Sequence, residues 1–132
     1  MKHYLTILFS LLLMGNAASA NLNVSVESLK GNLNITRVEL DMKNTFDQGV
    51  KDARAWFFLM DADGKVVGNQ PLWIIGGDSF QEKSLKSGES ETFKVAIKTT
   101  SKPVTAKVTF SKIIFEDGTE LDRAQIANSE VN

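Results

Sequence analysis

Apolar and polar residues alternate at every second position along most of this chain after residue 20. The segment RVELDMKN, residues 37–44, shows the pattern with three apolar side chains, those of Val38, Leu40 and Met42. Two later segments repeat the pattern with Phe93, Val95 and Ile97, and with Val104, Ala106, Val108 and Phe110. Successive side chains of a β-strand point to opposite faces, so the alternation predicts antiparallel strands with one face in a core and the other in water. No stripe of helical period and helix length follows residue 20.

Turn-forming residues separate these apolar segments. Lys30-Gly31-Asn32, Asp63-Gly64 and Asp117-Gly118 all stand between apolar runs. Glycine adopts positive φ without penalty, which makes Asp-Gly a common hairpin turn. About seven short strands with such turns predict an immunoglobulin-like antiparallel β-sandwich over residues 21–122. We expect the polar residues 123–132 to form a loose C-terminal tail or one short helical turn.

The alternation changes phase near residue 111. Apolar residues occupy even positions up to Phe110, whereas Ile113 and Phe115 are odd. Either a β-bulge near Ser111-Lys112 absorbs one extra residue within a continuous strand, or two separate strands meet at a kink.

The first 20 residues have the pattern of a signal peptide. Lys2 gives a short positive start, residues 5–14 form an apolar run of about ten, and Ala18-Ser19-Ala20 offers a small-x-small cleavage site. The run is shorter than the roughly 18 apolar residues that a transmembrane helix needs. We therefore expect cleavage after residue 20, export to the bacterial periplasm or beyond, and no transmembrane segment in the mature chain.

The composition of the mature chain argues against several kinds of site. Removal of 20 residues from 132 leaves 112, enough for one domain, which can bury roughly 65% of its unfolded surface and needs no disulfide. The chain has no cysteine, and its one histidine, His3, lies in the signal peptide. A thiolate metal site, a redox motif and a Ser-His-Asp triad are therefore not expected. Without Lys2, 14 basic residues stand against 16 acidic ones, a net charge of −2 with interspersed signs, so we expect no nucleic-acid binding.

The motif Asp61-x-Asp63-Gly64 follows a dense apolar run and raises the question of a cation site. A calcium loop needs oxygen ligands at alternate positions and a closing glutamate. Here Lys65 and two valines occupy the positions where further ligands would stand. The motif instead suits a hairpin, with aspartates that bond nearby backbone amides. We predict a turn and no metal.

The residues around this motif resemble a known family. Phe57-x-Leu59-Met60-Asp61 is similar to the signature of the FxLYD family of extracytoplasmic immunoglobulin-like β-sandwich domains, with Met60 where the family has tyrosine. The segments VELDMKNT, DADGKVVG and LKSGESETFKV also resemble the strand before the signature, the turn after it and the loop that leads into the next strand. The resemblance implies a sandwich fold, an exported setting and an accessory role, and it brings no catalytic residue.

The stretch DARAWFFLM, residues 52–60, is apolar on both faces of its expected strand. One side carries Ala53, Ala55, Phe57 and Leu59, and the other carries Trp56, Phe58 and Met60. The family pattern places Phe57 and Leu59 inward, whereas immunoglobulin domains often bury a tryptophan on this strand. The second face is either an exposed interaction patch or is covered by another segment, such as residues 71–75 or the C-terminal tail.

The stretch NQPLWIIGGDSF, residues 69–80, is the second candidate for binding. Pro71 predicts an edge strand or a loop, because proline cannot donate to a β-ladder. Trp73, with Phe80 nearby across a glycine-rich bend, could anchor a partner or stack on a sugar ring. The other interpretation is that Trp73 and Ile75 close the end of the sandwich.

A cluster of acids follows the last long strand and consists of Glu116, Asp117, Glu120 and Asp122. Paired acids hydrolyse glycosides when a cleft holds them at a fixed separation, but acids around Asp-Gly are typical of a solvated hairpin tip. We therefore expect no enzyme activity and no cofactor. The sequence predicts an exported accessory protein of the bacterial envelope that binds another envelope or extracellular protein through Trp56, Phe58, Met60, Trp73 and Phe80. The alternative is a carbohydrate-binding module with an aromatic platform of Trp73 and Phe80.

Overall fold

The structure is a computed structural model that describes residues 21–32, 34–77 and 83–126. The expected signal peptide, residues 1–20, and Phe80 lie outside the described residues.

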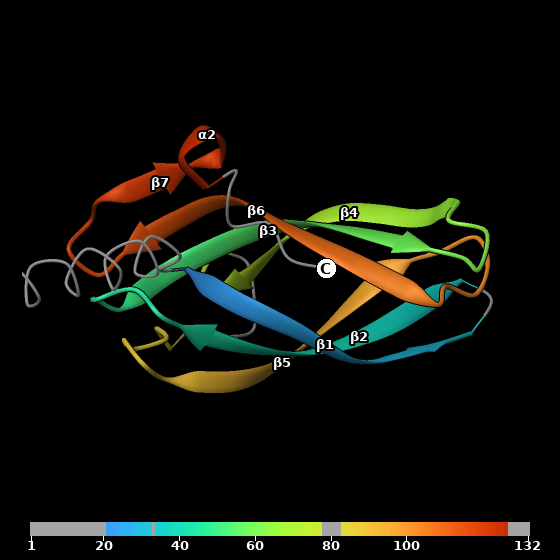
Figure 1. The fold of residues 1–132 in the computed structure, drawn as a ribbon, viewed down its shortest axis with the longest axis horizontal. Helices are drawn as coiled ribbons and strands as arrows, with labels where there is room; N and C mark the ends of the chain where they lie inside the picture. The colour runs from blue at the N-terminus through green and yellow to red at the C-terminus, as the bar shows by residue number, and fades with distance from the viewer. Residues whose placement is uncertain (1–20, 33, 78–82, 127–132) are drawn as a thin grey trace, which may run out of the picture.

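In residues 21–32, 34–77 and 83–126, seven strands form two antiparallel sheets that face each other (Figure 1). The three-stranded sheet has the order β1-β2-β5, and the four-stranded sheet has the order β4-β3-β6-β7. The strands are β1 (Leu22–Gly31), β2 (Ile35–Asn44), β3 (Val50–Met60), β4 (Val66–Ile75), β5 (Ser90–Lys98), β6 (Thr105–Phe115) and β7 (Glu120–Asp122). The predicted seven-stranded antiparallel sandwich is confirmed.

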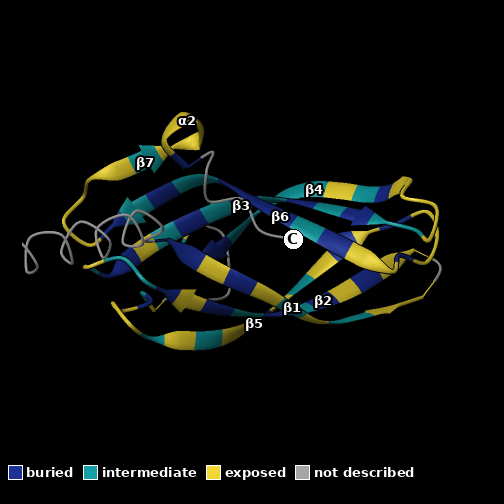
Figure 2. Cartoon of the chain, viewed as in Figure 1, coloured by how far each residue is buried: buried dark blue, intermediate teal, exposed yellow. Residues whose placement is uncertain are grey.

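The core lies between the sheets and is built from alternate residues of each long strand. On β3 the side chains of Ala53, Ala55, Phe57 and Leu59 are fully buried, and the residues between them are half-buried on the outer face. Figure 2 shows this alternation as bands of buried and intermediate residues along β3. The inward position of Phe57 and Leu59 is therefore confirmed, and Trp56 is not the buried tryptophan of an immunoglobulin core.

A single β-bulge accounts for the phase change in β6. Arg54 of β3 lies opposite Lys112, and the next residue, Ala55, lies opposite Phe110, so Ser111 is the extra residue. The Ser111 hydroxyl donates to the Arg54 carbonyl across the bulge, at 3.3 Å. Of the two alternatives, the continuous strand with a bulge is correct.

Val104 departs from the predicted core face. Its side chain is 55% exposed, because β6 begins only at Thr105. Pro103 immediately before it is buried, and the Val104 amide donates to the Met60 carbonyl at 2.8 Å. This residue ends the loop that enters β6 and takes no part in the alternation that follows.

The turns use their aspartates as backbone acceptors. Asp61 Oδ1 accepts from the amides of Asp63 and Lys65, both at 2.9 Å, and Gly64 has a φ of 81°. The carboxylate is thus a structural acceptor in the β3–β4 turn, as predicted. In the β6–β7 hairpin, Asp117 Oδ1 accepts from the amide and the hydroxyl of Thr119. These bonds hold the pKa of the Asp117 carboxyl below its ordinary value.

One helical turn, α2 (Arg123–Ile126), follows β7. Asp122 Oδ1 accepts from the Gln125 amide at 3.1 Å, and Gln125 Oε1 accepts from the Asp122 amide at 2.9 Å. This reciprocal pair is a capping box. Ile126 is buried against the core, so the helical turn, one of the two alternatives, is the form of residues 123–126. Within the described ranges, no helix has the length and apolar character to cross a membrane.

Candidate interaction surface on the four-stranded sheet

The outer face of the four-stranded sheet brings together apolar side chains from β3 and β4. Residues that lie opposite each other in an antiparallel ladder point to the same face. The ladder places Trp56 opposite Pro71, Arg54 opposite Trp73, and Met60 opposite Val66. We define the aromatic face as this outward set of Trp56, Phe58, Met60, Pro71 and Trp73, all of which are half-buried.

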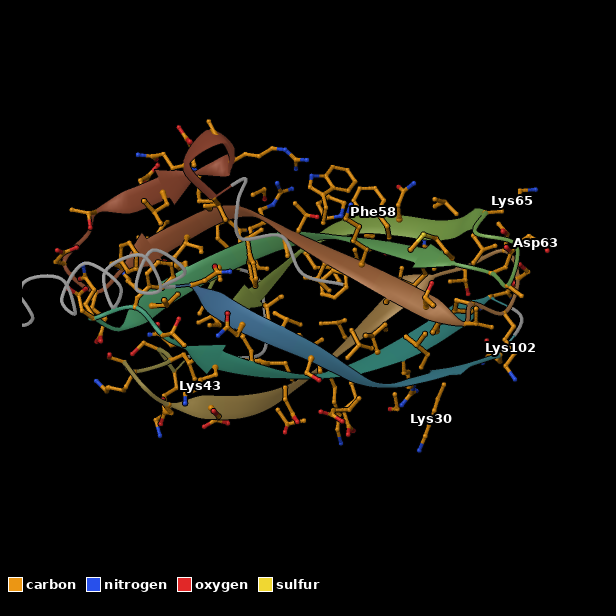
Figure 3. All side chains as sticks on the ribbon, in the orientation of Figure 1. Lys30, Lys43, Phe58, Asp63, Lys65 and Lys102 are labelled. Atoms are coloured by element: carbon orange, nitrogen blue, oxygen red, sulfur yellow. The ribbon has the colours of Figure 1, made fainter. Side chains whose placement is uncertain are left out.

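Trp56 and Phe58 form the centre of the aromatic face. They are two residues apart on β3, so both side chains leave the strand on the same side. Their ring centroids lie 6.1 Å apart with an interplanar angle of 19°. Figure 3 shows the Phe58 side chain on the outer side of the upper sheet, away from the space between the sheets. The two rings therefore form a pair of nearly parallel plates.

Pro71 and Trp73 extend this surface on the edge strand. Pro71 lies in β4, which is the edge of the sheet, as its missing amide predicts. Residues 71–75 lie beside β3 in the same sheet and do not fold over it, so this covering segment is excluded. The C-terminal tail beyond residue 126 lies outside the described residues.

Trp73 packs one side of its indole against a glycine. A Cβ atom added at Gly77 would lie 2.3 Å from indole Cδ2, and Gly77 has a φ of 52°. The Gly77 amide donates to Asp52 Oδ1 at 2.9 Å, which fixes the bend after β4. Trp73 is therefore oriented by the bend, whereas Ile75 is fully buried in the core. The interpretation that both residues close the sandwich holds for Ile75 only.

Cations flank the aromatic face on both sides of its centre. Lys107 of β6 lies opposite Phe58, and Arg54 lies two residues before Trp56 on the same outer face. Lys112, opposite Arg54, forms an ion pair with Glu120 at 3.8 Å. Thr109, opposite Trp56, is only 6% exposed although it lies on the outer face, so neighbouring side chains cover it.

The acids near residue 117 contact lysines or backbone amides. Glu116 lies 3.6 Å from Lys86 and Glu120 lies 3.8 Å from Lys112 in exposed ion pairs. Asp117 and Asp122 accept backbone amides in a turn and a helix cap. In the described part of the chain, no group of three or more potential metal-ligating side chains comes together.

Comparison with known proteins gives no family. No protein-family model matches the chain, and no curated protein matches it. A Bordetella pertussis protein solved under the name ApaA is similar in structure, with a TM-score of 0.49, 16% identity, and coverage of 77% of this chain and 85% of that chain. A target of the Northeast Structural Genomics Consortium gives a TM-score of 0.45 at 11% identity, over 77% of this chain and 76% of that one. A β-glucosidase from Kluyveromyces marxianus gives 0.40 at 12% identity, over 78% of this chain and only 14% of the enzyme. At these scores the likenesses carry no conclusion about activity or ligand.

Proposed function

We propose that this chain is an exported, non-catalytic accessory protein of the bacterial envelope that binds another protein through its aromatic face. The observation that carries the proposal is the pair of nearly parallel rings, Trp56 and Phe58, which lie half-buried on the outer face of a sheet. Aromatic rings on this outer face are not needed to fill the core, because Phe57 and Leu59 of β3 already do so from the inner face. Tryptophan is also the residue most enriched at binding hot spots.

The charges at its margin restrict the chemistry of the partner. Arg54 and Lys107 are the ionisable side chains that adjoin Trp56 and Phe58 in the described ladder rows. A partner surface with an apolar centre and acidic groups around it would be complementary, and its association would weaken with added salt. The resemblance of residues 57–61 to the FxLYD signature supports the accessory role and the exported setting.

Site-specific photocrosslinking tests the proposal. The chain, expressed in its source bacterium with residues 1–20, carries a photoreactive phenylalanine analogue in place of Phe58 or, as the matched control, in place of Lys94 on the opposite outer face. We expect a discrete protein adduct from position 58 and none from position 94. Trp56→Ala should then weaken binding to the purified partner by about 2 kcal/mol, with folding retained.

Two outcomes would reject this proposal. If Trp56→Ala unfolds the domain, the side chain belongs to the core and the aromatic face is not an interaction surface. If no adduct forms and a glycan array gives binding that Trp73→Ala removes, the protein is a carbohydrate-binding module instead. Because Gly77 covers one side of the Trp73 indole, a sugar could stack only on the other side.

A further inference from the structure

The two long sides of the sandwich differ in how the sheets are joined. On one side, β4 and β5 meet: the Thr100 amide donates to the Val67 carbonyl at 2.9 Å, and the Lys98 amide to Gln70 Oε1 at 3.5 Å. Gly68 permits the approach, because a Cβ there would lie 2.5 Å from the Lys98 carbonyl oxygen. This side is closed near the end of β5.

The other side is open between β1 and β6. A groove of about 700 Å³ runs there, between residues 24–29 of β1 and residues 103–106 at the start of β6. Its apolar lining comes from both walls and includes Val24, Val26, Leu29, Val104 and Ala106. The exposed side chain of Val104 is part of this lining, outside the core that its sequence pattern predicted.

One wall of the groove is a sheet edge. In the described ranges, β1 pairs with β2 and with no other strand. The β1 wall of the groove is therefore lined by main-chain groups of a sheet edge as well as by side chains.

The ladder shows which groups of β1 are directed into the groove. Asn44 of β2 directs its amide to Glu89 and its carbonyl to Gly88, on the β5 side. Backbone groups in an antiparallel ladder alternate between the two sides, so Met42 and Leu40 also direct theirs away from β1. Their partners on β1, Val24 and Val26, consequently point both amide and carbonyl outward, away from β2.

Glu27 sets the charge of the groove. It is the bulged residue of β1 and the one ionisable side chain among the described residues that line the groove. Its hydrogen bond to Asp41, together with the charge of Asp41, raises the pKa of the Glu27 carboxyl. The concentration of negative charge favours a basic residue at this point of any occupant and disfavours a second copy, which would bring its own Glu27.

From these observations we propose that the groove receives an extended segment of a partner polypeptide, which pairs with β1 as a fourth strand of that sheet. Peptide edges are satisfied by another peptide strand, with main-chain bonds for affinity and side-chain pockets for specificity. A strand rises about 3.3 Å per residue, so residues 24–29 match a segment of about six residues. The segment alternates apolar side chains toward Val24 and Val104 with polar ones, and it places a lysine or an arginine against Glu27.

The test uses random decapeptides displayed on phage and selected on the purified protein. We expect enriched peptides with alternating apolar residues and a basic residue. Synthetic versions of these peptides should bind Val26→Pro and Glu27→Lys at least tenfold more weakly than they bind the parent protein. They should bind two control variants as well as they bind the parent: Asp47→Lys, a charge change in an exposed loop, and Trp56→Ala. Val26→Pro removes only an outward amide, which leaves the internal ladder intact.

Three results would overturn the inference. In the first, the enriched peptides lose binding to Trp56→Ala but still bind Val26→Pro. In the second, no enriched peptide slows the amide exchange of Val24 and Val26. In the third, the protein self-associates and Val26→Pro abolishes the self-association. If Val26→Pro fails to fold, N-methylation of alternate peptide amides replaces it: tenfold weaker binding supports strand pairing, and unchanged binding rejects it. If the groove is shown not to bind a peptide strand, the proposed function of the aromatic face still stands, because Trp56→Ala tests that face alone.

Discussion

The two outer faces of this sandwich have the same geometry and opposite chemistry. The outer face of the three-stranded sheet is polar in nearly every row: Thr92 donates to Asp41 at 2.6 Å, and Lys94 pairs with Glu39 at 3.9 Å. The outer face of the four-stranded sheet instead carries the aromatic face, with cations only at its margin. Figure 3 shows the two faces from the side, with Phe58 on the upper sheet and Lys43 on the lower one.

This difference shows that the fold does not require apolar side chains on the outer face of a sheet. The polar face shows that a solvated outer surface is enough for this sandwich, because the core is complete between the sheets. The two tryptophans lie on the other outer face and outside this core, and our proposal is that they contact a partner. Four measurements test this contrast, and they are given in order of decreasing change in stability.

The first measurement compares two adjacent phenylalanines of β3. Phe57→Ala removes a fully buried ring and should lower the free energy of unfolding by about 3–5 kcal/mol. Phe58→Ala removes a half-buried ring from the outer face and should cost no more than about 1 kcal/mol. Urea denaturation measures both values. Equal losses would show that the outer face belongs to the folded core, and the contrast would disappear.

The second measurement compares two glycines with positive φ. Gly77→Ala places a methyl group against the Trp73 indole and should cost about 1–2 kcal/mol and displace the ring. Gly88 has a φ of 79°, and a Cβ atom added there would have open space around it. Gly88→Ala therefore introduces backbone strain but no steric clash. Thermal denaturation and the indole NMR signal of Trp73 follow both. A Trp73 signal that is unchanged in Gly77→Ala would mean that the bend does not orient the ring.

The third measurement concerns the polar face. Lys94→Ala breaks the ion pair between Lys94 and Glu39, whose side chains are 77% and 40% exposed, respectively. The variant should change the free energy of unfolding by no more than about 0.5 kcal/mol. Denaturation at low and high salt measures it. A larger loss would show that this face contributes to the fold through its charges.

The fourth and smallest effect is a pH dependence at Glu27. Its pKa is raised in the folded protein, so the folded state binds this proton more tightly than the unfolded state does. Stability therefore falls as pH rises from the ordinary value near 4.5 through the raised pKa. Glu27→Gln should raise the melting temperature slightly at pH 7, and the difference from the parent should vanish below about pH 4, where the carboxyl is neutral in both states. A larger gain at pH 3 than at pH 7 would reverse the assigned sign.

Local chemistry made much of this fold predictable from sequence. Alternation locates the long strands because a side-chain period of two is a property of one strand, independent of its neighbours. The turn at Asp61 and Gly64 was predictable for the same reason, because it depends on a few adjacent residues. The sequence also located the phase change near Ser111, but it left open whether a bulge or a break between two strands caused it. The sequence left the position of Trp56 open, because periodicity shows that β3 has two apolar faces and not which one meets the core, and the two family analogies pointed in opposite directions.

Other features depend on residues far apart in the chain. The groove lies between β1 and the start of β6, which are about 80 residues apart in the chain and meet only through the packing of the two sheets. Val104 matched the pattern of its strand and nevertheless lies outside it, since Pro103 and the bond to Met60 delay the start of β6. The pairing of Trp56 with Pro71 likewise follows from strand register and not from sequence spacing.

The position of the two tryptophans has a practical consequence. Trp56 and Trp73 are the only tryptophans of the chain, and both lie on one outer face, with none in the core. Intrinsic fluorescence of the folded protein therefore samples this surface and not the interior. Emission should shift to shorter wavelength when an occupant displaces water from these indoles, so the native chain carries its own optical reporter of docking.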